Sequence, residues 1–315
     1  MDDHTKLDLE AALKVIEDLL REQLKTSGRL PETIVTVGGT ALAALRIRER
    51  SDDVDLYMSE IDDTAIDTVT KKYRAQYGFN FKIDATPGNT IWGSFAIDDI
   101  DQSPTVATIE IGDVAVRIRA LTPETLYFIK VAADRPKDRI DVPLIASKCS
   151  YESLLPRALQ LFPWYGDRSA FPEYIERLAR SMARDFGRTI DSVYADFKLS
   201  EVVLVKAREI HAALESQFWQ VLKAMMAAKS ALILPDPANP SKLTFNVEDA
   251  NLPEELLALV HKEPVRVSDL AVSVLKAAEP KRYIAWLANI AAARNKPRDD
   301  DGGDGAGGGM SGGPG

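Results

Sequence analysis

The sequence feature that most constrains the fold of this chain is a pair of glycines, Gly38 and Gly39, between a strand-like run and a helix-like run. Residues 33–37 are all β-branched and predict a strand. Residues 40–48 predict a short helix with Thr40 as its N-cap. Glycines let a backbone approach a ligand closely, and a helix start offers unpaired amides. This turn can therefore hold a phosphate.

Two aspartates follow the glycine turn on the next predicted strand, residues 53–57. Side chains two positions apart on a strand share one face, so Asp53 and Asp55 present two carboxylates side by side. Like charges this close repel each other unless a cation neutralises them. Hard oxygen ligands favour Mg²⁺ or Mn²⁺. A phosphate cradle beside a metal-binding pair is typical of phosphoryl or nucleotidyl transfer.

Other motifs built from glycine or aspartate fit this segment poorly. An EF-hand loop needs Asp or Asn and then Gly where Tyr57 and Met58 stand. No Gly-Lys-Ser/Thr follows the glycines, so a P-loop is excluded. Leu42 stands where a dinucleotide-binding fingerprint needs its third glycine. By itself, an Asp-x-Asp pair is more often a solvated strand end or turn than a catalytic group.

Composition removes several classes of protein. The 315 residues include one cysteine and three histidines, which excludes a disulfide framework and a cysteine-rich zinc site. The acidic N-terminus is no secretory signal, and the chain has no apolar run of membrane-spanning length. With a single cysteine, we expect a reducing cytoplasm as the compartment. The net charge of −9 argues against broad, non-specific duplex binding.

The order of the predicted elements indicates an α+β fold in two domains and a tail. Residues 1–150 are predicted to form a mixed sheet with flanking helices, and residues 151–296 a mainly helical domain. Residues 297–315 are mostly Asp, Gly, Pro and Ser and predict a disordered tail. In the first domain we expect helices over 5–26, 62–77 and 122–133, and further strands over 79–85, 91–97, 105–111 and 114–118. In the second we expect helices over 174–186, 200–229, 254–260, 267–278 and 281–293, with a proline-rich loop over 235–240.

Two separated blocks resemble a known superfamily. Residues 37–42 (Val-Gly-Gly-Thr-Ala-Leu) and 50–56 (Arg-Ser-Asp-Asp-Val-Asp-Leu) resemble the nucleotidyltransferase superfamily, which has the DNA polymerase β-like fold. The Gly-Gly-Thr-Ala-Leu form is most similar to the AbiEii-like branch, which includes toxins of type IV toxin–antitoxin and abortive-infection systems. Residues 121–130 and 135–141 are similar to a second block of that branch. The sequence departs from the pattern at Asp52, where Ser, Thr or Lys is common.

The resemblance implies a metal-dependent nucleotidyltransferase that moves an NMP from an NTP to an RNA, such as a tRNA end, or to a protein hydroxyl. It also implies a cognate antitoxin as a partner. Asp53 and Asp55 would then hold Mg²⁺ or Mn²⁺. Lys130 would contact nucleotide phosphate, and Asp138 would be needed for activity, with Asp141 less securely assigned. The predicted triphosphate cradle consists of Gly38, Gly39 and Thr40.

The resemblance also implies a third metal-binding carboxylate on a later strand. Asp98, at the end of the strand predicted over 91–97, is slightly favoured over Asp84. Asp99 and Glu110 are lesser candidates.

Simpler interpretations stay open. Lys130 can be a solvated helix residue, and Asp138 and Asp141 can pair with Arg135 or Arg139. Arg177, Arg180 and Arg184 share one helix face, which suits either a nucleic-acid backbone or solvent, and we favour solvent. The alternatives for the whole chain are a nucleotide- or partner-binding module without turnover, or a transferase acting on a small molecule.

Overall fold

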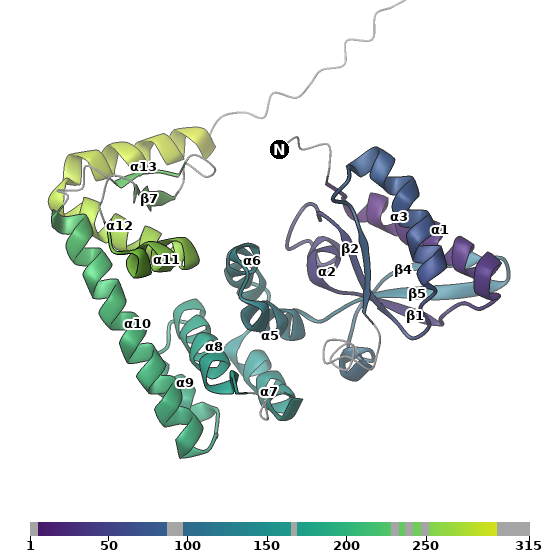
Figure 1. The fold of residues 1–315 in the computed structure, drawn as a ribbon, viewed down its shortest axis with the longest axis horizontal. Helices are drawn as coiled ribbons and strands as arrows, with labels where there is room; N and C mark the ends of the chain where they lie inside the picture. The colour runs from purple at the N-terminus through teal and green to yellow at the C-terminus, as the bar shows by residue number, and fades with distance from the viewer. Residues whose placement is uncertain are drawn as a thin grey trace, which may run out of the picture. The chain divides into compact units, whose positions relative to one another are not determined.

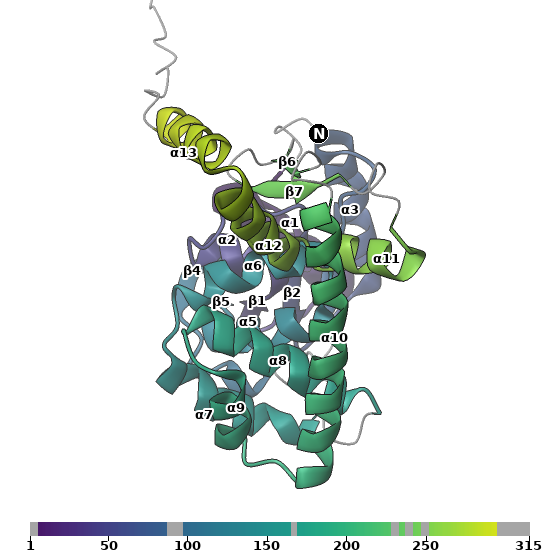
Figure 2. The same ribbon diagram turned by 90° about the vertical axis from the view of Figure 1, so that its left-hand side faces the viewer.

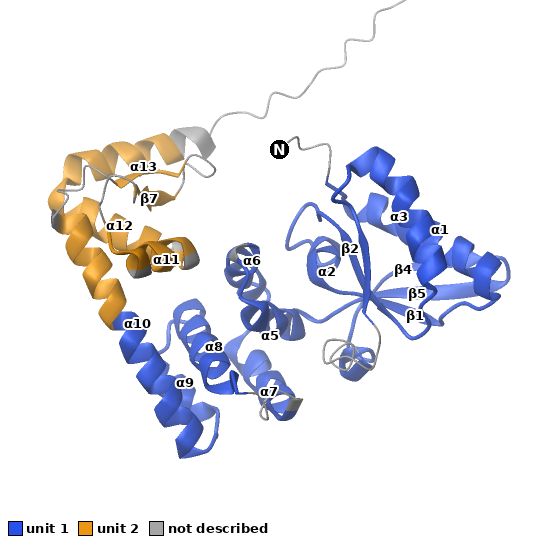
Figure 3. Cartoon of the chain, in the orientation of Figure 1, with its two compact units in different colours: residues 1–215 blue, residues 216–315 orange. Residues whose placement is uncertain are grey.

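The protein is described by a computed structural model, which covers residues 6–86, 97–164, 169–227, 233–236, 242–246 and 252–294 (Figure 1). By spatial contact the chain divides into two compact units, Met1–Glu215 and Ser216–Gly315 (Figure 3). The predicted boundary near residue 150 rests on a change of secondary structure, which is a different criterion, and it stays a prediction.

Unit 1 contains a five-stranded mixed sheet in the order β3-β2-β1-β5-β4. The central strand β1 pairs antiparallel with β2 and parallel with β5. Strand β3 adds to β2 in parallel, and β4 forms an antiparallel hairpin with β5. The mixed sheet predicted for this region is therefore confirmed. The strands are β1 (Thr33–Thr36), β2 (Val54–Met58), β3 (Ile83–Thr86), β4 (Thr105–Ile111) and β5 (Val114–Ala120).

Two helices, α1 (Leu9–Ser27) and α3 (Asp63–Tyr77), cover one face of the sheet and lie side by side (Figure 1). The side chain of Asp8 caps the start of α1, and Gly28 ends it in the left-handed conformation. Apolar residues of α1, α3 and the sheet share one buried cluster, since the residues on one helix face recur every three or four positions. These helices leave the opposite face of the sheet for the helices that follow.

A second core lies between the sheet and a group of helices. It combines residues of β1 and of α2 (Gly38–Ala44) with α5 (Pro123–Ala133) and the helices after it. Figure 2 shows α7, α8 and α9 grouped near α5. The remaining elements of unit 1 are α6 (Pro136–Ala146), α7 (Tyr151–Leu161), the 3-10 helix η2 (Phe162–Trp164), α8 (Phe171–Asp185), α9 (Ile190–Asp196) and the first part of α10 (Glu201–Ala227).

Unit 2 combines the end of α10 with a short hairpin and three helices. The hairpin joins β6 (Ile233–Pro235) to β7 (Leu243–Phe245), and β7 packs on α12. The loop predicted over 235–240 overlaps this hairpin only at Pro235, and residues 237–240 lie outside the described residues. The hairpin accommodates Pro235 at a strand end, where a missing amide is tolerated. The helices are α11 (Glu254–Lys262), α12 (Pro264–Ala278) and α13 (Pro280–Arg294).

The α+β fold predicted from the sequence is confirmed, with local differences. Residues 91–96 of one expected strand lie outside the described residues, and Ile97 begins a helical turn rather than ending a strand. Residues 79–82 form a turn and an approach to β3 instead of strand. Within the described ranges, none of the helices combines the length and apolar character needed to cross a bilayer.

Candidate active site

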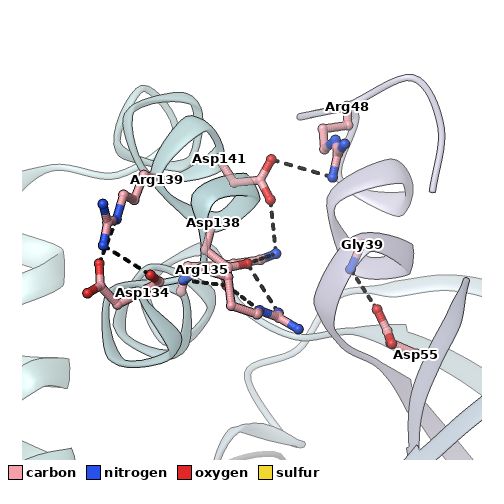
Figure 4. Close-up of polar contacts among 9 residues, drawn as sticks. Gly39, Arg48, Asp55, Asp134, Arg135, Asp138, Arg139 and Asp141 are labelled. Atoms are coloured by element: carbon pink, nitrogen blue, oxygen red, sulfur yellow. Dashed lines mark hydrogen bonds and ion pairs between the residues drawn. The ribbon is translucent and has the colours of Figure 1, made fainter. Parts of the chain in front are cut away.

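The two glycines lie in the first turn of α2, where the Asp55 and Ser51 side chains leave no room for a Cβ atom. Gly38 has a φ of 52°, in the left-handed region that favours glycine. A Cβ on Gly38 would lie 2.2 Å from Oδ2 of Asp55, and a Cβ on Gly39 would lie 2.4 Å from Oγ of Ser51. The Gly39 amide donates to the same Asp55 oxygen at 3.0 Å (Figure 4). The glycines therefore let the start of α2 close onto Asp55.

Thr40 acts between α2 and β2 rather than as a helix cap. The N-cap position belongs to Val37, so the predicted N-cap role of Thr40 is wrong. Its buried hydroxyl donates to the carbonyl of Asp53 at 3.1 Å and accepts from the amide of Asp55 at 2.9 Å. This side chain fixes the backbone that carries both aspartates. Its predicted part in holding nucleotide stays a prediction.

Asp53 and Asp55, here called the carboxylate pair, lie at the start of β2 with their charges poorly balanced. Burial raises the pKa of Asp53, and the negative charge of Asp55 raises it further. Burial also raises the pKa of Asp55, against the hydrogen bond from Gly39, and the charge of Asp84 adds to the rise. Asp84 is the direct register partner of Asp55 on β3. A cation would stabilise these groups in their ionised form.

Of the four candidates for a third acid, Asp84 lies beside the carboxylate pair, and the other three lie elsewhere. Asp98 is exposed in the turn at residues 97–99 and is not among the described residues that line the site cavities. Asp99 is fully buried and accepts from the amide of Thr122, the N-cap of α5, at 2.8 Å. Glu110 is exposed on β4, at the far edge of the sheet. The preference for Asp98 assumed a strand that ends at Ile97, whereas the structure forms a helical turn at this residue.

A second cluster joins Lys130 on α5 to two aspartates on α6. Lys130 Nζ lies 2.7 Å from Asp138 Oδ1 and 2.9 Å from Asp141 Oδ2. All three side chains are buried, with at most 3% of their surface exposed. The alternative interpretation of Lys130 as a solvated residue is therefore wrong. Buried charges of this kind are stable only when they are paired.

Two arginines complete what we call the ion-paired cluster: Lys130, Asp138, Asp141, Arg135 and Arg48. Arg135 contacts Asp138 through Nε at 2.6 Å and through Nη2 at 3.2 Å, while Arg48 Nη1 lies 3.5 Å from Asp141 (Figure 4). Burial alone would raise the pKa of Asp138. The hydrogen bonds from Arg135 and Lys130 outweigh burial, so this pKa lies below its ordinary value.

The ion-paired cluster is built on a tight corner between α5 and α6. α5 ends at Asp134, which adopts a left-handed conformation with a φ of 52°. Arg135 is the N-cap of α6, and Pro136 occupies its first turn, where a missing amide costs nothing. Asp138, at the third position, accepts from the backbone amide of Arg135 at 3.4 Å. The corner thus brings Lys130 and Asp138 together although they lie on different helices.

Two cavities adjoin this region and share Asp55, Asp84 and Arg135. The larger, of about 320 Å³, has an apolar part formed by Val37 and Ile129. The smaller, of about 90 Å³, is almost wholly polar and contains the carboxylate pair. Its cationic lining consists of Arg48, Lys82, Lys130, Arg135 and Lys137. The structure therefore brings together Gly38, Gly39, Asp53, Asp55 and Lys130, as predicted for one site, and adds four cations that sequence reasoning did not assign.

The carboxylate pair fits a magnesium or manganese ion. Among the described residues, no three carboxylate, histidine or cysteine side chains are close enough together to hold a metal by themselves. Mg²⁺ is usually held by one or two carboxylates together with substrate phosphates and water. The raised pKa values of Asp53 and Asp55 and their oxygen donors suit such a site. Asp84 is tied to Lys82, with 2.7 Å between Oδ2 and Nζ.

The arginine stripe on α8 is occupied by contacts within the protein. Arg177 Nη1 lies 2.8 Å from Asp134, and Arg180 Nε lies 2.9 Å from Glu176. Arg184 Nε lies 2.7 Å from Asp185. These pairs favour the interpretation of a structural helix face over a nucleic-acid track.

Comparison with known proteins gives one distant neighbour. No family model matches the chain, and no curated protein matches its sequence. The structure is similar to the crystal structure of an antigenic nucleotidyltransferase-like protein from Paracoccidioides brasiliensis. The match has 15% sequence identity and a TM-score of 0.26, and it covers 53% of this chain and 94% of that chain. A likeness at this level decides neither the fold nor the activity, so the case for function rests on the site itself.

Proposed function

We propose that this chain is a metal-dependent nucleotidyltransferase that moves an NMP from an NTP to an acceptor hydroxyl. The observation that carries the proposal is the carboxylate pair, which the glycine turn holds against a cavity lined by five cationic side chains. A site with both strong anions and strong cations suits a metal–triphosphate complex, because each part of that complex finds its opposite charge.

The aspartates of the site have distinct roles in this proposal. When bound, Mg²⁺ or Mn²⁺ would neutralise the charge that develops on the phosphates. Asp53 and Asp55 would hold it, and the Gly39 amide keeps the Asp55 carboxylate in place. The acceptor oxygen bonds to the α-phosphorus as the bond from the α-phosphorus to the bridging oxygen breaks and pyrophosphate leaves. Asp84, beside Asp55 and half exposed, would take the proton of the acceptor hydroxyl.

The acceptor and the biological role rest on the sequence resemblance. Similarity to the AbiEii-like branch supports an RNA acceptor, such as a tRNA end, or a protein hydroxyl. It also supports a role as the toxin of a type IV toxin–antitoxin or abortive-infection system, with an antitoxin partner in the cytoplasm. The residues that carry this part are those of the two motif blocks, 37–56 and 121–141.

Two observations favour other candidates. No three metal-ligating groups come together among the described residues, which favours a module that binds nucleotide without turnover. The net charge of −9 favours a cationic small molecule over RNA as the acceptor.

A label-transfer assay separates these functions. The protein is incubated with each NTP labelled at the α-phosphate, with Mg²⁺ and total RNA, and in parallel with NTP labelled at the γ-phosphate. We expect α-label, and no γ-label, to enter RNA or protein. The transfer should be absent in Asp53→Asn/Asp55→Asn and normal in Asp67→Asn, a matched change of an exposed aspartate on α3. Nucleotide binding without any transfer would support the binding module, and transfer only to an added aminoglycoside would support the small-molecule enzyme.

A further inference from the structure

The positive charge of Lys130 is already used inside the protein. Two of its three N–H donors point to the carboxylates of Asp138 and Asp141, at 2.7 and 2.9 Å, and all three groups are buried. A phosphate would therefore meet Lys130 together with two negative charges. An ammonium group in this setting is poorly suited to be the main phosphate ligand.

Arg135 has the opposite character. Its side chain is 57% exposed, and it lines both cavities. One edge of the guanidinium donates hydrogen bonds to Asp138 through Nε and Nη2. Nη1 makes no hydrogen bond or ion pair with any residue in the described part of the chain. In Figure 4 this guanidinium extends from α6 toward the side that carries Gly39 and Asp55.

We propose that Arg135, and not Lys130, binds the phosphates of the substrate, and that Asp138 is a positioning residue that orients it. This inference rests on the proposed function. Guanidinium groups bind phosphate oxygens in a planar, two-pronged geometry, and an arginine held by a carboxylate loses little freedom when it does so. Lys130 then supports the arrangement indirectly, because its Nζ donates to Asp138 Oδ1, the oxygen that Arg135 Nη2 also contacts.

Lys137 and Lys82 also line the smaller cavity but are held differently. Lys82 is paired with Asp84 at 2.7 Å, and no contact that fixes Lys137 is described. A lysine without such a contact adds charge without fixing geometry. Arg135 thus combines exposure, a fixed orientation and a nitrogen that has no partner among the described residues.

The test compares nucleotide binding at equilibrium. The four NTPs and the four NMPs are titrated with Mg²⁺ by calorimetry into the wild type, Arg135→Gln, Arg135→Lys and Asp138→Asn. We expect Arg135→Gln to weaken NTP binding by about 10- to 100-fold, with NMP binding changed by less than about threefold. Arg135→Lys should recover only part of the loss, because an ammonium lacks the planar fork. Lys71→Gln, an exposed lysine on α3, should bind as the wild type does.

Asp138 is tested by coupling. If it acts through Arg135, the double variant Arg135→Gln/Asp138→Asn should bind NTP no more weakly than Arg135→Gln alone. Additive losses would overturn the positioning role. Thermal unfolding of Arg135→Gln, measured alongside, should stay close to that of the wild type, because the side chain is exposed.

The outcomes separate the inference from the function it rests on. A wild type that binds no NTP overturns both. NTP binding that is unchanged in Arg135→Gln overturns the inference and leaves the proposed function standing. Equal weakening of NTP and NMP binding, together with a lower unfolding temperature, would mean that Arg135 is only structural, which also overturns it.

Discussion

The carboxylate pair and members of the ion-paired cluster line the same cavity, but the pKa values of their aspartates are shifted in opposite directions. Asp53 and Asp55 carry raised pKa values, because burial disfavours their charge and so does repulsion, from Asp55 in the case of Asp53 and from Asp84 in the case of Asp55. Asp138, buried more deeply, has a lowered pKa because two cations touch it. One region is built with unbalanced charge and the other with balanced charge.

This difference in charge balance separates residues that bind a ligand from residues that stabilise the fold. Unbalanced carboxylates at a partly open position are unfavourable until a cation arrives, so they indicate binding. Balanced carboxylates in a closed position contribute to stability by being paired, and they influence a ligand only through their partners. The following predictions test this division.

The largest expected effect is on transfer. In Asp53→Asn/Asp55→Asn we expect nucleotidyl transfer to fall by roughly 10⁴-fold, because the metal loses both carboxylates. Stability should not fall, since the repulsion disappears and an asparagine oxygen can still accept from the Gly39 amide. Steady-state rates and urea unfolding give the two readouts. A clear loss of stability would mean that the pair is structural.

The second effect is on stability. Lys130→Met leaves Asp138 and Asp141 buried with fewer partners, and we expect it to lower the free energy of unfolding by about 3–5 kcal/mol. Urea titration followed by circular dichroism measures this change. Arg135→Gln is the matched control in the same cluster and should cost less than Lys130→Met, because Lys130 still pairs with Asp138 and the arginine side chain is mostly exposed. Equal losses in both variants would contradict the division.

The third effect separates backbone strain from crowding at the glycine turn. Gly28→Ala places a Cβ in open space at a φ of 71°, so only the strain of about 1–2 kcal/mol is expected. Gly38→Ala has similar strain, and its Cβ also collides with the carboxylate of Asp55. We expect Gly38→Ala to be the less stable of the two and to lose transfer activity, which Gly28→Ala should keep. Urea unfolding and the transfer assay compare them.

The smallest effect is a dependence on pH. The pKa of Asp138 is lower in the folded protein than in the unfolded chain, so its ionisation stabilises the fold above the unfolded value of about 3.9. That contribution is lost as pH falls through the folded pKa. The difference in unfolding free energy between the wild type and Asp138→Asn should therefore shrink below about pH 4. A difference that is constant from pH 6 to pH 3 would argue against the pairing.

Much of the fold could be predicted because its signals are local. The periodic apolar residues of α1 and the Thr122-Pro123 start of α5 are confirmed, since each depends on residues within one element. The hairpin of β6 and β7 escaped prediction because its strands are three residues long and one contains Pro235. Short strands lack the alternation that reveals a sheet face.

The candidate site could be predicted only in part, because its contacts cross between elements. The glycines and the Asp-x-Asp pair are visible in sequence, and the structure places them together. Asp84 could not be preferred to Asp98, because the choice depends on which strand pairs with β2. The sequence does contain a signal for the position of Arg135. Arg-Pro-Lys-Asp is typical of a helix start with an acid at its third position, and that acid lies beside the N-cap arginine.

The parallel pairing of β1 with β5 sets the order in which this site can assemble during folding. The contacts of Lys130 with Asp138 and Asp141 join residues only 8 and 11 positions apart, and the carboxylate pair is placed by the neighbouring segments β1 to β3. The two halves meet when Thr33 pairs opposite Arg117, which closes a loop of about 80 residues. Such long-range contacts form late. We therefore expect a partly folded chain to hold both halves before it holds a site, so that competence to bind nucleotide arises in the last steps of folding.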